Sequence, residues 1–596
     1  MYIVPKPQKA EIKNEFLKNR TVKFMEGSLD SRILKAVQKL PLDQGGIPLY
    51  ITYNETNEEG YRLLVSNEEI RIEGKGINGA FYGIQTLRQI FENETLCCVE
   101  IEDNPKNEFR AFYHDITRGR VPKLDTLKSL VDDLAYYKIN FLQLYMEHAF
   151  PFKEHYGTID ESCCTMPEDI RALDEYCHDN FIDLVPSIAT CSHLFDLLNV
   201  PENQHLRELI DYKPKYTFWY ERMDHHTINV THPESLSFVK SLIDQYIENF
   251  SSEYVHICGD EPFDLTLWSN RREPDCDVHA LFIDFFRQIL DYVKSKGKKV
   301  MIWGSIVPVD KLELKKKFPE GTIMCCAGYL EEPPEERFSK YYKDNFKTIF
   351  CPSTSTYFRL IENVNVSRLN IKKLAEYGLK YDADGMMNTN WGDYGNPCSL
   401  ALSKFGLVAG SQVSWNFENP IDDDFSKAAN LLLYKNEKGF EYVAKAGLVH
   451  DKAPFWALVR YYSNIIHGSE TRVTIFPKGK EIREAAKEAK ELYEELSVQR
   501  WEKDEFRLEL LSSIYGTAVI AELFAKHMGI ELERWTNTES WLANYRTLWL
   551  QKNKESELFR IEEFFRHLEE LPPQNKVFID YAYEKTASQG EAPEIV

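Results

Sequence analysis

The stretch Glu253-Tyr254-Val255-His256-Ile257-Cys258-Gly259-Asp260-Glu261 decides how we interpret this chain. A largely apolar run ends abruptly in glycine, and two adjacent carboxylates follow it. A short apolar run bounded by glycine predicts a buried strand, and acids at the carboxyl end of such a strand stand where barrel enzymes carry their chemistry. In a chain with 94 Asp plus Glu, two solvated acids that happen to follow a strand are the simpler alternative.

Asp260 and Glu261 are neighbours in the chain, so their charges repel each other. Their environment should therefore push the two pKa values apart and leave one carboxyl better suited to hold a proton near neutral pH. We expect a proton donor and a charged stabiliser to lie side by side.

Short apolar runs alternate with longer helical segments from about residue 108 to about residue 420. This pattern is typical of parallel βα units. Eight runs predict a (β/α)8 TIM barrel, whose active site lies at the carboxyl ends of the strands. A doubly wound sheet is the competing fold, but no Gly-x-Gly-x-x-Gly turn follows any of the eight runs. The predicted strands are Ala111–Ile116, Asn140–Met146, Ile182–Ala189, Tyr254–Cys258, Lys299–Ile306, Thr322–Ala327, Thr348–Cys351 and Gly385–Asn390.

Changes in composition and hydrophobic pattern along the sequence predict two further domains. Residues 1–105 combine alternating strand-like pieces with an amphipathic segment at 77–91 and predict a small α/β domain. Residues 106–434 form the barrel, and residues 435–596, rich in Glu, Lys, Ala and Leu, predict a helical domain. That domain could cap the barrel or provide the surface of a homodimer. Two apolar helix faces are predicted there, Ile482/Ala485/Ala489/Leu492/Leu496 and Ile514/Ala518/Ala521/Leu523.

Composition excludes some classes of partner. The chain has 596 residues and a formal charge of −22, which argues against general binding to nucleic acid or to anionic membranes. No apolar run approaches the ~20 residues that span a bilayer, and the start lacks the apolar core of a secretory signal. The 12 cysteines show no disulfide-framework or zinc-ribbon spacing. We expect a cytoplasmic protein with reduced thiols, no metal and no cofactor.

The chain resembles glycoside hydrolase family 20, the β-N-acetylhexosaminidases, at several separate places. That family ends its fourth barrel strand in His-x-Gly-Gly-Asp-Glu, and here Cys258 replaces the first glycine. The family's noncatalytic domain carries a phrase similar to Gly79-Ala80-Phe81-Tyr82-Gly83-Ile84-Gln85-Thr86-Leu87-Arg88-Gln89. Variant signatures such as Tyr145-Met146-Glu147-His148 look like the intracellular bacterial branch, which adds a helical C-terminal domain.

The resemblance implies which residues follow the first three strands in the site. Arg118 matches an arginine that binds sugar hydroxyls; a salt bridge under the barrel rim is its structural alternative, and Arg120 could be confused with it. His193 matches a histidine that links a carboxylate to the catalytic acid. The usual aspartate is missing, so we expect Glu147 to supply that charge. A core histidine satisfied by backbone is the alternative.

The later strands carry aromatic and acidic residues that suit a pyranose pocket, since sugar faces stack on rings and hydroxyls need polar partners. These are Trp303, Trp391 and Asp393, with Trp415 as a competing register for Trp391. Tyr357, or alternatively Tyr394, is expected to donate its phenol to an acetamido oxygen.

The implied activity is a retaining exo-β-N-acetylhexosaminidase that removes terminal GlcNAc or GalNAc from an N-acetylhexosamine-terminated oligosaccharide or glycoconjugate. In this family the substrate's own acetamido oxygen attacks and forms an oxazolinium. Glu261 would be the acid and base, and Asp260 would orient the acetamido group. The alternatives are a noncatalytic sugar-binding descendant, a glycosidase of other specificity, and a metal hydrolase using His256, although no His-Glu-x-x-His pattern occurs.

Overall fold

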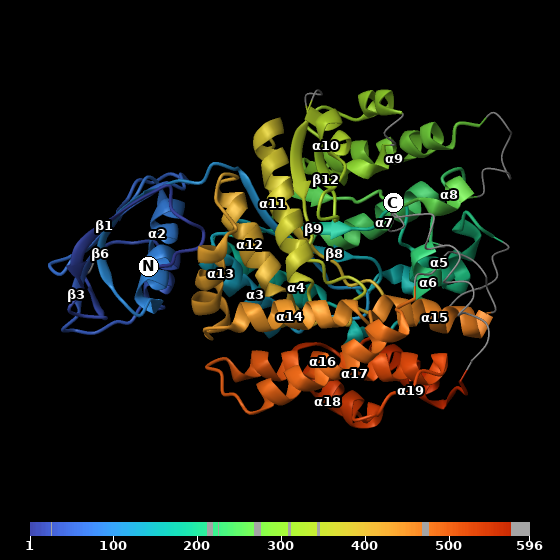
Figure 1. Ribbon diagram of the computed structural model, residues 1–596. Helices are drawn as coiled ribbons and strands as arrows, with labels where there is room; N and C mark the ends of the chain where they lie inside the picture. Colours follow the sequence, from blue (N-terminus) through green and yellow to red (C-terminus); the bar gives the residue numbers. More distant parts are fainter. Residues whose placement is uncertain are drawn as a thin grey trace.

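A computed structural model describes residues 1–25, 27–210, 218–224, 226–267, 276–307, 311–342, 346–467 and 476–573. Three regions follow one another along the chain: an N-terminal sheet, a central barrel, and helices that lie along one side of the barrel (Figure 1). The predicted fold class, a TIM barrel with an N-terminal α/β region and a C-terminal helical region, is confirmed.

Eight parallel strands close the barrel in chain order, and the last strand pairs with the first. Every predicted run forms one of them. Both faces of a barrel strand are covered, by the interior and by the outer helices, and all residues of β7 and β14 are accordingly buried. The strands are β7 (Phe109–Asp115), β8 (Phe141–Met146), β9 (Asp183–Ile188), β10 (Tyr254–His256), β11 (Lys299–Trp303), β12 (Ile323–Ala327), β13 (Lys347–Cys351) and β14 (Gly385–Asn390).

Strand β10 is shorter than predicted. It ends at His256 rather than Cys258, because Cys258 takes a left-handed backbone conformation with φ 55°. Ile257 still donates its amide to the Met301 carbonyl at 3.0 Å, so the chain stays pinned to β11 as it leaves the strand.

Amphipathic helices surround the barrel. In α9, for example, the buried positions form one face, and the Asp277 carboxylate caps the first turn by accepting from the amides of His279 and Ala280. The outer helices are α3 (Leu124–Tyr136), α4 (Pro167–Asp179), α7 (Ser235–Ile247), α9 (Val278–Ser295), α10 (Glu335–Tyr342), α11 (Val364–Tyr381) and α12 (Lys404–Trp415). Short helices α5 (Phe195–Asn199), α6 (Phe218–Asp224) and α8 (Phe263–Leu267) lie in the connections at the carboxyl end of the barrel.

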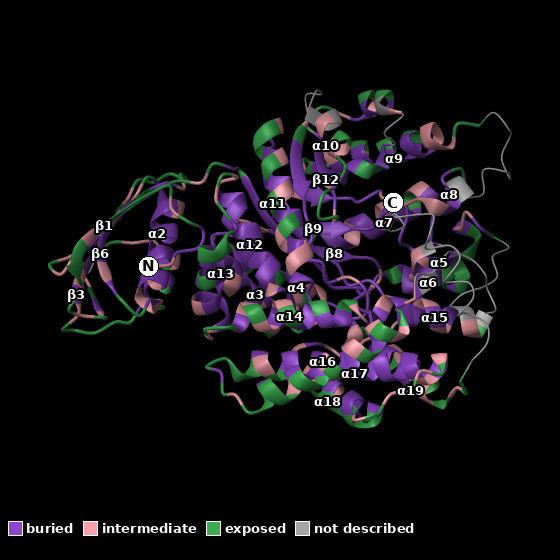
Figure 2. Ribbon diagram, in the orientation of Figure 1, coloured by how far each residue is buried: buried purple, intermediate pink, exposed green. Residues whose placement is uncertain are grey.

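The N-terminal region is a six-stranded sheet in the order β1-β6-β4-β5-β3-β2, with α1 (Ser31–Val37) and α2 (Ile77–Glu92). Helix α2 is almost wholly buried, since it lies between the sheet and the barrel (Figure 2). Gln89 on α2 donates to the Tyr136 carbonyl of α3 at 3.0 Å and so ties the two regions together. The strands are β1 (Lys9–Phe16), β2 (Val22–Phe24), β3 (Ile47–Tyr53), β4 (Tyr61–Val65), β5 (Ile70–Gly74) and β6 (Cys97–Asp103).

A Gly-x-Gly-x-x-Gly spacing does occur outside the barrel, at residues 74–79 between β5 and α2. Two of the amides near the helix terminus are already occupied: Ile77 donates to the Thr56 carbonyl at 2.8 Å and Gly79 to the Glu58 carbonyl at 3.0 Å. A side chain at Gly79 would meet the Gly60 carbonyl at 2.0 Å. The glycines therefore allow a loop to lie across this helix terminus, and the motif here is structural.

The helical region contains α13 (Asp423–Ala429), α14 (Gly439–Asp451), α15 (Phe455–His467), α16 (Gly479–Ser497), α17 (Asp504–Met528), α18 (Thr538–Lys552) and α19 (Leu558–Glu570). The predicted apolar face of α16 is buried as expected. Helix α17 differs from the prediction of a single apolar face, because it is surrounded by other helices and buried on most sides. By length and composition α17 could cross a membrane, but 89% of its apolar window is buried inside the protein, as in the core helix of a bundle.

Candidate active site

The predicted site residues come from seven strand ends but gather at the carboxyl end of one barrel. Arg118 follows β7, Glu147 follows β8 and His193 follows β9. Asp260 and Glu261 follow β10, and the aromatic and acidic residues of the later strands complete the set, namely Trp303, Tyr357, Trp391 and Asp393. Parallel strands bring their carboxyl ends to the same rim, which is why residues so far apart in sequence meet.

The backbone at the tip of β10 is held in an uncommon conformation. Cys258, Gly259 and Glu261 have φ values of 55°, 94° and 53°. A side chain at Gly259 would lie 2.6 Å from Phe286 and 2.7 Å from Ile306, so only glycine fits. Left-handed non-glycine residues are uncommon and gather at functional sites, and here they accompany a turn that places both carboxylates near His193.

His193 joins the two carboxylates. Its Nε2 lies 3.5 Å from Asp260 Oδ2 and 3.2 Å from Glu261 Oε2. Burial and the nearby Arg118 lower the pKa of His193, but its interactions with Asp260 and Glu261 outweigh both and raise that pKa to about 10. Burial raises the pKa of Asp260, yet His193 more than compensates, and the pKa falls below its ordinary value. Asp260 is therefore held in its ionised form.

Glu147 lies near the Nδ1 side of His193, but its shortest contact is with another residue. Its Oε1 is 3.8 Å from His193 Nδ1, whereas Arg118 Nε donates to the same oxygen at 2.7 Å. Arg118 Nη2 is closer to the imidazole, at 3.0 Å from Nδ1. Although burial raises the pKa of Glu147, Arg118 and the neighbouring histidines hold it well below its usual range. Glu147 thus acts on His193 largely through Arg118.

The structure separates the two candidate arginines. Arg118 also donates to Asp393 Oδ1 at 2.6 Å, so it bridges the ends of β7, β8 and β14 inside the site. Arg120 points toward the helical region instead: its guanidinium donates to the Tyr545 hydroxyl at 2.9 Å and stacks 4.0 Å from the Trp549 ring. Of the two arginines, only Arg118 contacts the other candidate site residues, and it does so as an ion-pair partner of Glu147 and Asp393.

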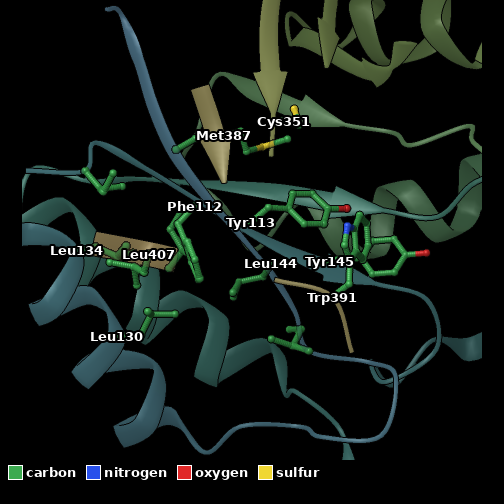
Figure 3. Packing of buried hydrophobic residues seen from close by; sticks show 14 of the residues in the cluster. Phe112, Tyr113, Leu130, Leu134, Leu144, Tyr145, Cys351, Met387, Trp391 and Leu407 are labelled. Atoms are coloured by element: carbon green, nitrogen blue, oxygen red, sulfur yellow. The ribbon is translucent and has the colours of Figure 1, made fainter. Parts of the chain in front are cut away.

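Aromatic rings form the floor beneath these charges. Trp391 lies 5.7 Å from Trp303, 5.3 Å from Tyr145 and 5.0 Å from Tyr113 between ring centroids. Figure 3 shows Tyr113, Tyr145 and Trp391 grouped together. Trp415, the competing register, lies on α12 and donates to Asp103 at 3.0 Å in the interface with the N-terminal sheet. Trp391 is therefore the site tryptophan of the two.

Burial raises the pKa of Asp393 to about 6, against the opposing influence of Arg118. This carboxyl therefore changes charge within the range where many enzymes work. It accepts from Arg118 and lies close enough to Glu261 and His193 for their charges to influence its pKa.

Tyr357 is half-buried, and burial raises its pKa to about 12, so its phenol keeps its proton and can donate. Its ring lies 6.1 Å from Tyr329, whose hydroxyl accepts from Trp391 Nε1 at 2.9 Å. Tyr394, the alternative, packs its ring 4.4 Å from Phe358. Tyr329 was missed at the sequence level, although it stands two residues after β12, where a strand-end search would have found it.

His193, Asp260 and Glu261 also offer ligand atoms that lie within 4.8 Å of one another, a spacing that could accept a metal ion. His256, the histidine considered from sequence, is not part of this group; it lies in the barrel interior with its ring 4.8 Å from Trp303. The raised pKa of His193 favours the protonated imidazole, which opposes metal binding because a histidine ligand must be neutral.

Two family profiles match most of the N-terminal two thirds of the chain. The profile "Glycosyl hydrolase family 20, catalytic domain" matches residues 107–415, and "Glycosyl hydrolase family 20, domain 2" matches residues 1–104. The beta-hexosaminidase of Porphyromonas gingivalis is 26% identical over 286 residues, covering 42% of this chain and 36% of that protein. Human beta-hexosaminidase subunit beta is 24% identical over 294 residues, covering 46% and 50%. The chain thus spans half or less of these curated relatives.

Solved structures share the fold. The β-N-acetylhexosaminidase of Bacteroides fragilis superposes with a TM-score of 0.55 at 22% identity and covers 72% of this chain and 94% of that one. A Flavobacterium johnsoniae chitobiase gives 0.57 at 17% identity, covering 95% and 99%. Because the catalytic profile alone matches more than half of the sequence, and the paired acids stand at the end of the fourth barrel strand, the chain belongs to glycosyl hydrolase family 20.

Proposed function

We propose that this protein is a β-N-acetylhexosaminidase that releases terminal N-acetylhexosamine from oligosaccharides or glycoconjugates. The observation that carries the proposal is the pair Asp260 and Glu261, held on one imidazole above an aromatic floor. Support comes from relatives named beta-hexosaminidase and from a structural neighbour, the Vibrio harveyi exo-β-N-acetylglucosaminidase, in complex with N-acetylglucosamine.

Glu261 would protonate the departing glycosidic oxygen and later take a proton from water. A positioned carboxyl of this kind contributes roughly 10²–10⁴-fold to the rate. The substrate's acetamido oxygen would attack the anomeric carbon as the glycosidic bond breaks, so both reacting atoms belong to one molecule and the configuration is retained overall.

Asp260 would accept the acetamido N–H and stabilise the positive charge that develops as the oxazolinium forms. Its depressed pKa keeps the carboxylate charged for this purpose. Tyr357 would donate its phenol to the acetamido oxygen and fix the direction of attack.

The remaining residues would hold the sugar. Asp393 and Arg118 would supply acceptors and donors for ring hydroxyls, and Trp391 would supply its ring to the pyranose face. Trp303, which is 2% exposed, packs against Trp391 from within the barrel. Asp393 is one methylene shorter than the glutamate common in the family, which leaves more room beside the sugar hydroxyls.

Paired aryl glycosides test the proposal. The purified protein should cleave aryl N-acetylglucosaminide or N-acetylgalactosaminide and leave the matching glycosides without a 2-acetamido group essentially untouched. Equal turnover of both classes would indicate a glycosidase with a different mechanism. Binding without turnover would identify a noncatalytic sugar-binding descendant.

A further inference from the structure

Glu557, from the segment that precedes α19, reaches the active site from the helical region. Its Oε2 accepts from Arg222 Nη1 at 3.0 Å, and its Oε1 lies 3.9 Å from His148 Nε2. Glu557 and Arg222 are both largely shielded from solvent, with side chains 13% and 3% exposed. No strand-end pattern of the barrel includes this residue.

Four elements meet around these charges. Arg222 of α6 also pairs with Asp196 of α5 at 3.1 Å, and Asp196 Oδ2 lies 3.3 Å from His148 Nδ1. His148 follows β8, and its Nδ1 lies 3.8 Å from Glu147 Oε2. We call Glu557, Arg222, Asp196 and His148 the rim network.

The rim network is connected to the catalytic pair. Glu147 presents one oxygen to His148 and the other to Arg118, and Arg118 in turn lies against His193 and Asp393. A buried carboxylate with two cationic neighbours is held in one orientation, because moving it would leave a charge without a partner. Displacement of His148 would therefore be passed to Arg118 through Glu147.

The backbone around Glu557 also touches the loop that carries Arg118. The Lys554 amide donates to the Val121 carbonyl at 2.8 Å, and the Glu557 amide donates to the Gly119 carbonyl at 3.4 Å. Ser556 Oγ donates to the same Gly119 carbonyl. The segment thus contacts the site through its backbone as well as through its carboxylate.

We propose that Glu557 is a positioning residue of the active site, which holds His148 and Arg222 so that Glu147 keeps Arg118 and His193 in place for catalysis. The inference rests on the proposed function. It makes the helical region part of the catalytic unit. It concerns a residue outside the family's strand-end pattern.

The test compares Glu557→Gln with Glu555→Gln. Glu555 lies two residues earlier in the same segment and pairs with Arg546 at an exposed position, so it serves as a matched control. Glu557→Gln should lower kcat/KM on an aryl N-acetylglucosaminide between about 10- and 100-fold, as expected when a supporting residue lets reactive groups shift. Glu555→Gln should match the wild type. Equal activity of the two variants overturns the proposal.

A cycle with Glu147→Gln separates positioning from general loss of structure. If Glu557 acts through Glu147, adding Glu557→Gln to Glu147→Gln should cost less than about twofold more, because neighbouring residues in one network are not additive. Fully additive losses overturn the inference. Glu557→Asp keeps the charge and should recover part of the activity, and thermal melting of each variant checks that it is folded.

The proposed function can fail separately. If the wild-type protein cleaves no aryl N-acetylhexosaminide, only the proposed function is overturned. Calorimetry then tests the inference by comparing the affinities of wild type, Glu557→Gln and Glu555→Gln for N-acetylglucosamine. Weaker binding confined to Glu557→Gln supports it, and equal or absent binding in all three overturns it.

Discussion

Two buried clusters of charged and aromatic residues lie at opposite ends of the barrel and differ in how completely they are satisfied. In the interface with the N-terminal sheet, Lys138 donates to the Tyr61 hydroxyl at 2.9 Å and pairs with Asp103 at 3.3 Å. Asp103 also accepts from Tyr61 at 2.9 Å and from Trp415 at 3.0 Å. Each charge there has short, specific partners.

In the candidate active site the partners are shared and longer. Two carboxylates compete for His193 Nε2, at 3.5 and 3.2 Å, and Asp260 Oδ1 is buried with no hydrogen-bond partner among the described residues. A buried polar atom left unsatisfied is costly in the resting fold. Buried charge alone therefore does not distinguish the two clusters; the active-site cluster differs in leaving a buried carboxylate oxygen of Asp260 without a hydrogen bond from the described part of the chain.

The largest effect is expected from Glu261→Gln. It should lower kcat by about 10³-fold or more on substrates with poor leaving groups and far less on activated aryl glycosides, because only the former need a proton. Rate measurements across a leaving-group series check this. Equal losses of kcat across the series would contradict the role of Glu261 as the acid. They would also remove the catalytic side of the contrast between the two clusters.

Lys138→Met tests the satisfied cluster. It leaves Asp103 buried without its ammonium partner and should lower the free energy of unfolding by about 3–5 kcal/mol, with kcat per folded molecule unchanged. Denaturant unfolding measures the loss. Lys299→Met, at an exposed pair with Glu253, is the control and should unfold like the wild type. A catalytic defect without a stability defect would reverse the assignment of this cluster.

Asp260→Asn should weaken binding of a thiazoline mimic of the cyclised intermediate by about 10²-fold, since the positive ring loses its counter-charge. The free energy of unfolding should fall, because the lowered pKa of Asp260 means that its ionised form, paired with His193, favours the fold. Inhibition constants and melting curves measure the two effects. Undiminished affinity would count against the orienting role of Asp260.

Asp393 should give the smallest effect, visible as a pH dependence. Its folded pKa is raised from the ordinary 3.8 to about 6, so its protonated form favours the fold, and that contribution is lost as pH rises through about 6. Sugar binding follows the opposite direction, because Arg118 and the hydroxyls need the carboxylate. KM should rise as pH falls through about 6, and Asp393→Asn should make KM higher by up to about tenfold and flat in this range. A wild-type KM independent of pH between 5 and 7 would contradict this.

Much of the barrel could be predicted from sequence because its strands are short apolar runs with clear ends. The acids and tryptophans at those ends followed from the same pattern and the family resemblance. The early end of β10 could not be predicted, since the left-handed turn at Cys258 depends on packing around Gly259.

Long-range pairings were also beyond the sequence. Nothing near Arg120 indicates that it stacks on Trp549, and nothing near Glu147 indicates that Arg118 would take its shortest hydrogen bond. Side-chain direction and partner choice emerge only once the strands and helices are placed. The contribution of Glu557 belongs to the same class.

The position of Arg120 has a practical meaning for anyone who recombines parts of this protein. The Arg120 guanidinium extends from the loop after β7 and contacts Tyr545 and Trp549 of α18. A truncation after the last barrel helix would remove both rings and expose this buried cation to solvent. Chimeras and truncated variants of this protein should therefore keep the barrel and the helical region together.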